Sequence, residues 1–307
     1  MKETSFPIQI TDDDIEWVQA LMPDVEFDDC RVEILKNMEP VDIHACPGSG
    51  KTTLLVAKLA ILANKWEDSH RGICVLSHTN VAREEIQERL GKTKVGKKLL
   101  TYPHFIGTFQ SFFDIFVVMP WLRSFEQPVN IVDTDYVTER RWKSLWSKTW
   151  LEKKGKDKSV CDPVGLPYKL DISCSEKTNT YKDLIRVIKE SRLRGEFTFN
   201  EMQLWAARII EIKPIMRDIM QERFPILFID EAQDTKSEIW EMVNSLYRNS
   251  ANGSFYQAYG DSNQAIFDSY EKMGTLKYFP RENALSMLNS KRFTPQIAQF
   301  ANSVALD

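Results

Sequence analysis

The sequence predicts an α/β fold, in which a parallel sheet carries a phosphate-binding loop and a mainly helical region is inserted. Three observations support this prediction. A short, partly apolar stretch at 41–44 runs into a glycine-rich turn and then into a helix-forming run at 54–62. Compact apolar runs that end in polar residues recur at 73–76 and 226–229, which is typical of buried parallel strands. The region 117–199 differs from the rest, because it is rich in tryptophan and lysine.

The composition is that of a soluble globular protein with room for about two domains. The 307 residues are 43% hydrophobic and 27% charged, and the net charge is −4. Nucleic-acid contact must therefore come from local patches. The five cysteines form no Cys-x-x-Cys pair, which favours reduced thiols, a cytoplasmic location and no zinc site. The longest apolar run, 54–63, is interrupted by Lys58 and is too short to cross a bilayer, so no membrane contact is expected.

Residues 11–36 are predicted to be helical and precede the first strand. Capping groups at 11–14 come before an apolar series that starts at Ile15, and Asp28-Asp29 comes before a second series. These helices lie just upstream of the phosphate-binding loop in the sequence. They either contact the adenine of a bound nucleotide or pack on the sheet, and the residues alone leave both interpretations open.

The stretch around Lys51 is the centre of the predicted site. Gly48 and Gly50 allow the backbone to curl so that N–H groups face phosphate oxygens, and the next helix adds the positive end of its dipole. Lys51 is predicted to reach the β- and γ-phosphates, and the Thr52 hydroxyl to bind Mg²⁺. The residues assigned to nucleotide binding are Ala45, Cys46, Pro47, Gly48, Ser49, Gly50, Lys51, Thr52 and Thr53. The alternative is a glycine-rich turn that only precedes a helix.

Polar side chains follow two further predicted strands. Ser77-His78-Thr79-Asn80 follows the strand at 73–76 and precedes a helix at 81–90, and the stretch 105–112 repeats this pattern. The carboxyl ends of parallel strands form the ligand-binding edge of an α/β sheet. Either stretch alone is weak support for a ligand site.

The inserted region contains tryptophans at four-residue spacing. Trp142, Trp146 and Trp150 are predicted to share one face of a helix. The basic residues around them are Arg140, Arg141, Lys143, Lys148, Lys153, Lys154, Lys156 and Lys158. Two interpretations remain open. The region is either a nucleic-acid surface, or a small helical domain with a tryptophan core and solvated lysines.

An acidic pair follows the most strand-like run of the chain, 226–229. Two carboxylates at the end of a buried strand are costly unless a metal or a partner receives them. Beside a phosphate-binding loop, Asp230 is predicted to hold Mg²⁺ and Glu231 to polarise the attacking water. The alternative is that the acidic pair only caps the helix that follows. Two later residues are also assigned to this site. Gln264, which follows a strand at 254–259, is predicted to sense either the γ-phosphate or the attacking water, and Arg292, which precedes a helix start, to contact phosphate.

In order and in content, these stretches resemble the UvrD/Rep-type superfamily 1 helicases. The matching stretches are 48–52 (motif I), 77–80 (motif Ia), 107–112, 230–234 (motif II), 260–267 (motif III) and 290–292 (motif IV). The resemblance implies a RecA-like P-loop NTPase domain with ATP and Mg²⁺ as cofactors. It also implies single-stranded DNA, or a junction of single and double strands, as a partner. The DNA-binding residues implied are His78, Thr79, Thr108, Phe109, Gln110 and Phe267, and the catalytic ones are Lys51, Glu231, Gln264 and Arg292.

The resemblance also implies domain boundaries. Residues 1–116 and 200–287 are expected to form the first RecA-like domain, 117–199 the helical insertion, and 288–307 the start of a truncated second RecA-like domain. Motifs V and VI are absent from this stretch, so the chain alone is expected to hydrolyse ATP poorly. The glutamine that the family has upstream of motif I aligns with Arg31.

Two functions are predicted by this pattern. The first is an ATP-dependent DNA helicase or translocase of the UvrD/Rep type. The alternative is a non-translocating, ATP- and DNA-sensing regulatory subunit of a nuclease complex in DNA repair or anti-phage defence, with a nuclease or another protein as partner. The two functions are distinguished by whether the protein moves along DNA.

Overall fold

The computed structural model describes residues 8–248, 253–264, 278–287 and 289. The chain divides into two compact units, one formed by Met1–Phe109 with Arg217–Asp307 and the other by Gln110–Met216. The second unit is longer at both ends than the predicted insertion, 117–199. The difference arises because the helical segments on either side of the predicted insertion, 114–118 and 199–212, pack on each other.

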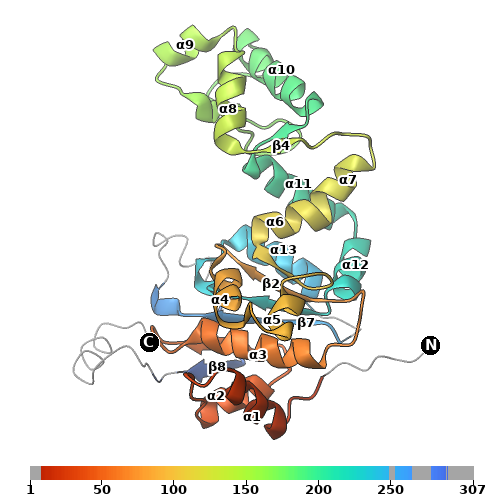
Figure 1. Ribbon diagram of the computed structural model, residues 1–307. Coiled ribbons are helices and arrows are strands. Elements are labelled where there is room, and N and C mark those ends of the chain that lie inside the picture. The colour runs from red at the N-terminus through yellow and green to blue at the C-terminus, as the bar shows by residue number, and fades with distance from the viewer. Residues whose placement is uncertain (1–7, 249–252, 265–277, 288, 290–307) are drawn as a thin grey trace. The chain divides into compact units, whose positions relative to one another are not determined.

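The first unit is built on a parallel sheet with the strand order β3-β2-β6-β7-β1-β8 (Figure 1). The strands are β1 (Asp42–Ala45), β2 (Ile73–Ser77), β3 (Phe105–Thr108), β6 (Ile226–Ile229), β7 (Phe255–Gly260) and β8 (Ala284–Met287). In the register, Ser77 lies opposite Thr108 and His44 opposite Gly260. The α/β fold with a parallel sheet is therefore confirmed, and β8 is a strand that the sequence analysis did not predict.

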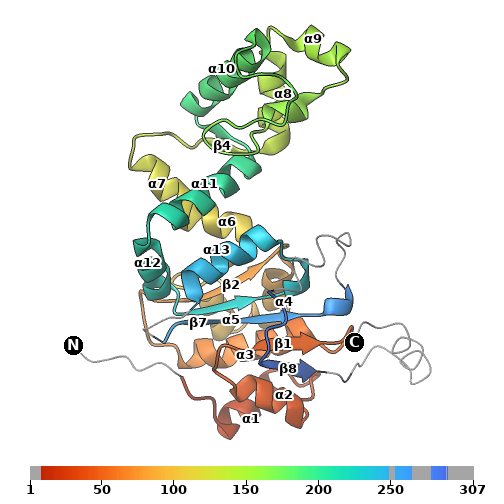
Figure 2. The ribbon, with the colours of Figure 1, turned by 180° about the vertical axis from the view of Figure 1, so that it is seen from behind.

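Helices cover both faces of this sheet. They are α1 (Asp12–Leu21), α2 (Asp29–Lys36), α3 (Lys51–Lys65), α4 (Val81–Leu90), α5 (Lys94–Leu99), α12 (Ile215–Arg223) and α13 (Ser237–Tyr247). Figures 1 and 2 show α3, α4 and α5 on one face and α13 on the other. Helix α3 is buried along Leu54–Ala63, because α1, α2, α4 and α5 pack around it. This burial fixes the helix that follows the phosphate-binding loop.

The second unit is mainly helical. Its elements are α6 (Phe109–Phe113), a π-helical segment η1 (Asp114–Val118), α7 (Met119–Arg123), α8 (Thr134–Lys143), α9 (Lys148–Lys153), a 3₁₀ turn η2 (Lys158–Cys161), α10 (Asn179–Leu193) and α11 (Phe199–Ile212). A two-stranded parallel sheet joins β4 (Ile131–Val132) to β5 (Glu196–Phe197). Its interior holds a charged cluster, in which Glu201 accepts hydrogen bonds from Arg141 at 2.7 Å and Arg192 at 2.8 Å. None of the helices in the described ranges has the length and apolar character needed to cross a bilayer.

The three tryptophans do not share one helical face, so that prediction is wrong. Helix α8 ends at Lys143 and α9 begins at Lys148. The break is fixed by Asp183, whose carboxylate accepts hydrogen bonds from both the backbone N–H and the hydroxyl of Ser147 at 2.8 Å. As a result, Trp142 is 8% exposed, Trp146 is 80% exposed and Trp150 is 45% exposed.

Candidate nucleotide-binding site

The loop between β1 and α3 adopts the conformation that its glycines permit. Gly48 and Gly50 have φ values of 72° and 85°, in the left-handed region that other residues avoid. Gly50 is the N-cap of α3, which begins at Lys51. The loop is tied to β8, because the Cys46 N–H donates to the Met287 carbonyl at 3.1 Å. The helix N-terminus and the curled backbone together favour an anion.

A cavity of about 490 Å³ opens over this loop. Its lining residues are Gly48, Ser49, Gly50, Lys51, Thr52, Thr53, Glu231 and Gln264. Ala45, Cys46 and Pro47, which were also predicted to bind nucleotide, precede this lining. The cavity therefore brings together six loop residues, one residue of the acidic pair and the glutamine that follows β7.

The acidic pair lies next to the loop. Asp230 is fully buried and accepts a hydrogen bond from the Thr52 hydroxyl at 3.2 Å. Burial, and then the charge of Glu231, raise the pKa of the Asp230 carboxyl to about 6. A buried carboxylate held beside a hydroxyl fits Mg²⁺, which is usually held by one or two carboxylates together with phosphates and water. Lys51 Nζ lies 3.8 Å from Glu231 Oε2, so both charged side chains reach the cavity.

Glu231 is held in an unusual backbone conformation by its neighbours. Its φ of 50° and ψ of 49° lie in the left-handed region, a strain that occurs most often at functional sites. The Gln233 amide donates to Glu231 Oε2 at 2.7 Å, and the Gln233 carbonyl oxygen accepts from the Asp261 N–H at 2.9 Å. Sequence reasoning gave Gln233 no role, since this bridge depends on the contact between the 3₁₀ turn η3 (Ala232–Asp234) and the end of β7.

Arg31 contacts the phosphate-binding loop from helix α2. Its guanidinium donates to the Ser49 carbonyl at 2.7 Å and to the Asn289 carbonyl at 3.1 Å, and forms an ion pair with Asp28. Arg31 is buried. The structure therefore connects the position that aligns with the family's glutamine to the backbone of the loop. The sequence held one sign of this contact. Arg31 stands where the family has a glutamine, and it lies three residues after the capping residue Asp28.

The residues predicted to bind DNA follow the neighbouring strands β2 and β3. The His78 imidazole makes a 3.0 Å hydrogen bond with the Thr235 hydroxyl, and its ring centroid lies 5.2 Å from that of Phe109. Burial and the charge of Lys236 lower the pKa of His78. Phe109 is only 3% exposed, whereas Thr79 is exposed and Thr108 is half-buried. The structure thus brings His78, Thr79, Thr108 and Phe109 together at one edge of the sheet.

Gln110 is the first residue of the second unit, and its amide donates to Asp114 Oδ1 at 2.8 Å. Phe267 and Arg292 lie outside the described residues.

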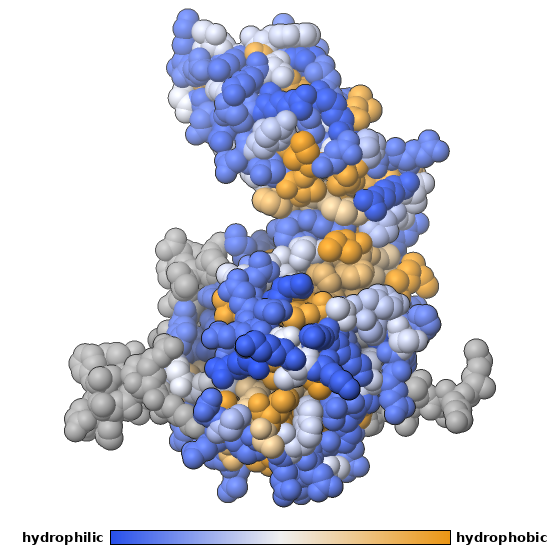
Figure 3. All heavy atoms as spheres, in the orientation of Figure 1, coloured by the Kyte–Doolittle hydropathy of each residue, from blue (hydrophilic) through white to orange (hydrophobic). Residues whose placement is uncertain are grey.

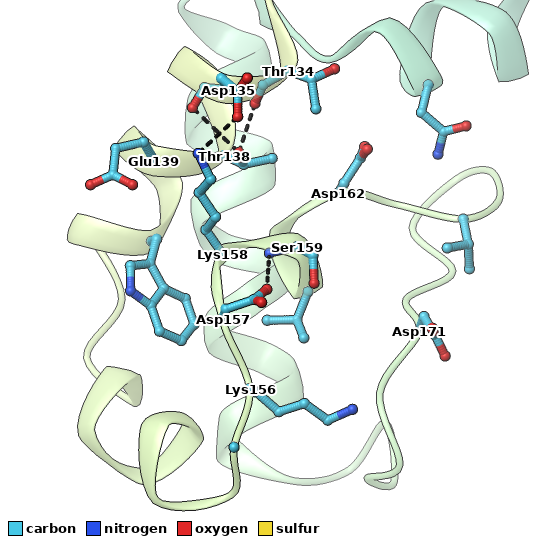
Figure 4. A pocket seen from close by; sticks show the side chains of 15 residues that line it. Thr134, Asp135, Thr138, Glu139, Lys156, Asp157, Lys158, Ser159, Asp162 and Asp171 are labelled. Carbon is cyan, nitrogen blue, oxygen red and sulfur yellow. Dashed lines mark hydrogen bonds and ion pairs between the residues drawn. The ribbon is translucent and has the colours of Figure 1, made fainter.

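A second cavity, of about 880 Å³, lies within the helical unit (Figure 4). Its carboxylates are those of Asp135, Glu139, Asp157, Asp162 and Asp171, against the lysines Lys156 and Lys158. Lys158 is already engaged, because its ammonium lies 2.8 Å from Asp135 Oδ1. This lining is unsuited to phosphate. Within the described residues, no cluster of three or more His, Cys, Asp or Glu side chains could hold a metal ion.

The glycine-rich loop, the buried strand-end acid and the parallel sheet define a RecA-like P-loop NTPase domain with a mainly helical insertion. The chain belongs to the UvrD/REP helicase family, because the model of the UvrD/REP helicase N-terminal domain matches residues 31–270.

Three individual proteins are similar to this chain. The chain is 23% identical over 293 residues to the ATP-dependent DNA helicase PcrA of Staphylococcus aureus, covering 89% of this chain and 39% of PcrA. It is 34% identical over 95 residues to the Gabija protein GajB of Bacillus cereus, covering 30% of this chain and 17% of GajB. Among solved structures, Pif1 of Bacteroides sp in complex with ADP-AlF4 matches with a TM-score of 0.38 and 13% identity, covering 91% of this chain and 46% of Pif1. The chain therefore spans well under half the length of PcrA.

Proposed function

We propose that this chain binds Mg-ATP at the phosphate-binding loop and contributes to an ATP-dependent DNA helicase or translocase of the UvrD type. One observation carries the proposal. Lys51, Thr52 and Glu231 line one cavity, and Asp230 lies within hydrogen-bond distance of Thr52. This is the set of groups that phosphoryl transfer from a nucleoside triphosphate requires. The expected cellular location is the cytoplasm.

Each residue has a separate role in the proposal. The loop N–H groups and the Lys51 ammonium bind the β- and γ-phosphates. Thr52 and Asp230 would hold Mg²⁺, which neutralises phosphate charge. Glu231 accepts a proton from the attacking water, and the Gln233 amide orients the Glu231 carboxylate. Gln264 lines the same cavity and is suited to contact the γ-phosphate.

The proposed DNA contact is single-stranded and lies where β2 and β3 end. His78, Thr79, Thr108 and Phe109 support it, because they lie together and the carboxyl ends of parallel strands are the ligand-binding edge. His78 also bonds to Thr235, four residues after Glu231. A short chain of contacts therefore runs from the proposed DNA-binding residues to the segment that carries the acidic pair.

The test is nucleotide binding and phosphate release, measured with and without single-stranded DNA. Lys51→Ala is expected to abolish ATP binding and leave the fold intact, since Lys51 supplies charge to the phosphates and little packing. Glu231→Gln is expected to retain Mg-ATP binding and lose hydrolysis. Lys65→Ala, on the same helix as Lys51, is the control. Normal ATP affinity in Lys51→Ala would refute the proposal.

The second candidate is a non-translocating, ATP- and DNA-sensing subunit of a nuclease complex in DNA repair or anti-phage defence. This candidate is kept because of the similarity to the Gabija protein GajB. GajB has the higher identity of the two curated relatives reported above, and its name is not that of a helicase. Directional movement along single-stranded DNA, measured by displacement of a bound block from one strand end, supports the helicase. ATP-dependent DNA binding without movement supports the sensing subunit.

A further inference from the structure

At the corner between α8 and α9, the indole of Trp146 is exposed to solvent. Trp142, Leu145 and Leu151 on either side of it are buried in the core of the helical unit, whereas Trp146 is 80% exposed. Burying a large aromatic side chain is favourable, so an indole that stays exposed beside a hydrophobic core forgoes that stabilisation. The feature therefore calls for an explanation other than packing.

The exposed indole is held in place. The Arg186 guanidinium lies 3.8 Å from the centroid of the Trp146 ring. Arg186 is itself fixed, because it donates to Asp183 at 2.8 Å, to both carboxylate oxygens of Glu190 at 3.0 Å and to the Ser144 carbonyl at 2.8 Å. One face of the indole thus contacts an ordered cation. Because the indole is already held in place, its side chain loses little further entropy when a ligand stacks on it.

A second aromatic and several cations lie in the same segment. Trp150 is 45% exposed, and the Lys154 ammonium lies 5.8 Å from its ring centroid. Within the described part of the chain, Lys153, Lys154 and Lys156 form no ion pair. Residues 140–158 contain eight lysines and arginines, of which Arg140, Arg141, Lys143, Lys148 and Lys158 pair with carboxylates. The three lysines named above are the cations of this segment that remain for a ligand. The corner is therefore a local basic patch with exposed aromatics.

We propose that this corner, formed by Trp146, Trp150, Lys153 and Lys154, is a stacking surface for single-stranded nucleic acid. Exposed aromatics that stack on unpaired bases, combined with cations for the backbone, are the chemistry of single-strand binding. A duplex hides its base faces, so it cannot use the indoles in this way. An apolar protein partner fits less well, because the face drawn in Figure 3 is largely hydrophilic over α8, α9 and α10.

This surface adds to the proposed function and rests on its claim that the protein binds single strands. It uses none of the residues at the ends of β2 and β3, so the two can be tested separately.

The experiment measures the affinity of the protein for a fluorescent oligo(dT) and for a duplex of the same length, across a salt series. Trp146→Ala is expected to weaken oligo(dT) binding about fivefold or more, since one stacked base contributes about 1–3 kcal/mol. Trp146→Phe should retain most of the affinity, and duplex binding should not change. Phe125→Ala is the matched control, because Phe125 is an exposed aromatic of the same unit outside the basic segment.

A second variant tests the charges. Lys153→Glu with Lys154→Glu should weaken oligo(dT) binding and reduce its dependence on salt. The charge-matched control is Lys94→Glu with Lys97→Glu, on exposed positions of α5. Wild-type affinity for oligo(dT) in Trp146→Ala would overturn this inference alone. An absence of oligo(dT) binding by the unmodified protein would overturn the proposed function as well.

Discussion

The Gln233 amide donates a 2.7 Å hydrogen bond to the Glu231 carboxylate. At its other end, the same side chain accepts from the backbone N–H of Asp261, which follows β7. Gln233 therefore orients the carboxylate that is proposed to receive a proton from water, and it also binds the backbone at the end of strand β7.

Removing this bridge should slow hydrolysis more than it weakens nucleotide binding. Gln233→Ala is expected to lower kcat about tenfold or more with little change in KM for ATP, because Glu231 loses its orienting donor. Gln233→Glu should be at least as slow, since a second carboxylate cannot donate and would repel Glu231. Steady-state phosphate release checks both variants, and a normal kcat in Gln233→Ala would show that the bridge is not needed.

Gly260 allows the same bridge to form. A Cβ at this position would lie 2.7 Å from the Gln233 side-chain oxygen and 2.7 Å from the Phe279 ring. Gly260→Ala is therefore expected to reproduce the kinetic defect of Gln233→Ala and also to lower the unfolding temperature. Gly165→Ala is the control, because its new Cβ would make a milder contact, at 3.1 Å from Lys169 Cβ, in the helical unit. A variant with unchanged kcat would contradict the proposed clash.

Arg31 should act on nucleotide affinity. Arg31→Ala removes the donor to the Ser49 and Asn289 carbonyls. The Ser49 carbonyl is buried there, and leaving a buried carbonyl without a partner costs about 1–3 kcal/mol. The expected result is a KM for ATP raised about tenfold, with kcat less affected and partial rescue by Arg31→Lys. Lys36→Ala on the same helix, which breaks an exposed ion pair with Asp12, should change neither value. An equal fall in kcat alone would instead assign Arg31 to the chemical step.

Stability should depend on pH through Asp114. Burial raises the pKa of this carboxyl to about 6, against a hydrogen bond from Gln110 that lowers it. The folded state therefore binds the proton more tightly than the unfolded state does, and the stabilisation is lost as the pH rises through about 6. The loss is at most about 3 kcal/mol, since one pKa unit corresponds to about 1.4 kcal/mol.

Asp114→Asn removes this titration. The variant should gain stability relative to the unmodified protein at pH 8 and differ little from it at pH 4, as measured by urea midpoints. Asp13→Asn, at an exposed position of α1, is the control. A stability difference for Asp114→Asn that is the same at both pH values would contradict the assignment.

The sequence predicted those parts of the fold that depend on local pattern. The strand at 226–229 and the helix at 81–90 were found with their observed bounds, because a continuous apolar run and a clear apolar spacing mark them. Strand β8 was not predicted, since three of its four residues are not buried and its place is set by pairing with β1. The helix break before α9 was missed because Asp183, which fixes it, lies 36 residues further along the chain.

The candidate site divides in the same way. Lys51, Thr52, Asp230 and Glu231 were predicted, since each belongs to a short motif whose chemistry is local. The bridge through Gln233 depends on packing between distant segments. The contact of Arg31 with the Ser49 carbonyl also joins separate parts of the chain. No spacing rule in a single sequence predicts such contacts.

The helical unit leaves the sheet after β3, which is the edge strand of the described sheet, and the chain returns through α12 to β6. The insertion is therefore a side branch of the fold. Lengthening or replacing it would change the entropy of closing one loop, which varies only slowly with loop length, and would leave the pairing of the strands intact. The P-loop core and the insertion can thus vary independently, so that the same core fold can carry different inserted domains.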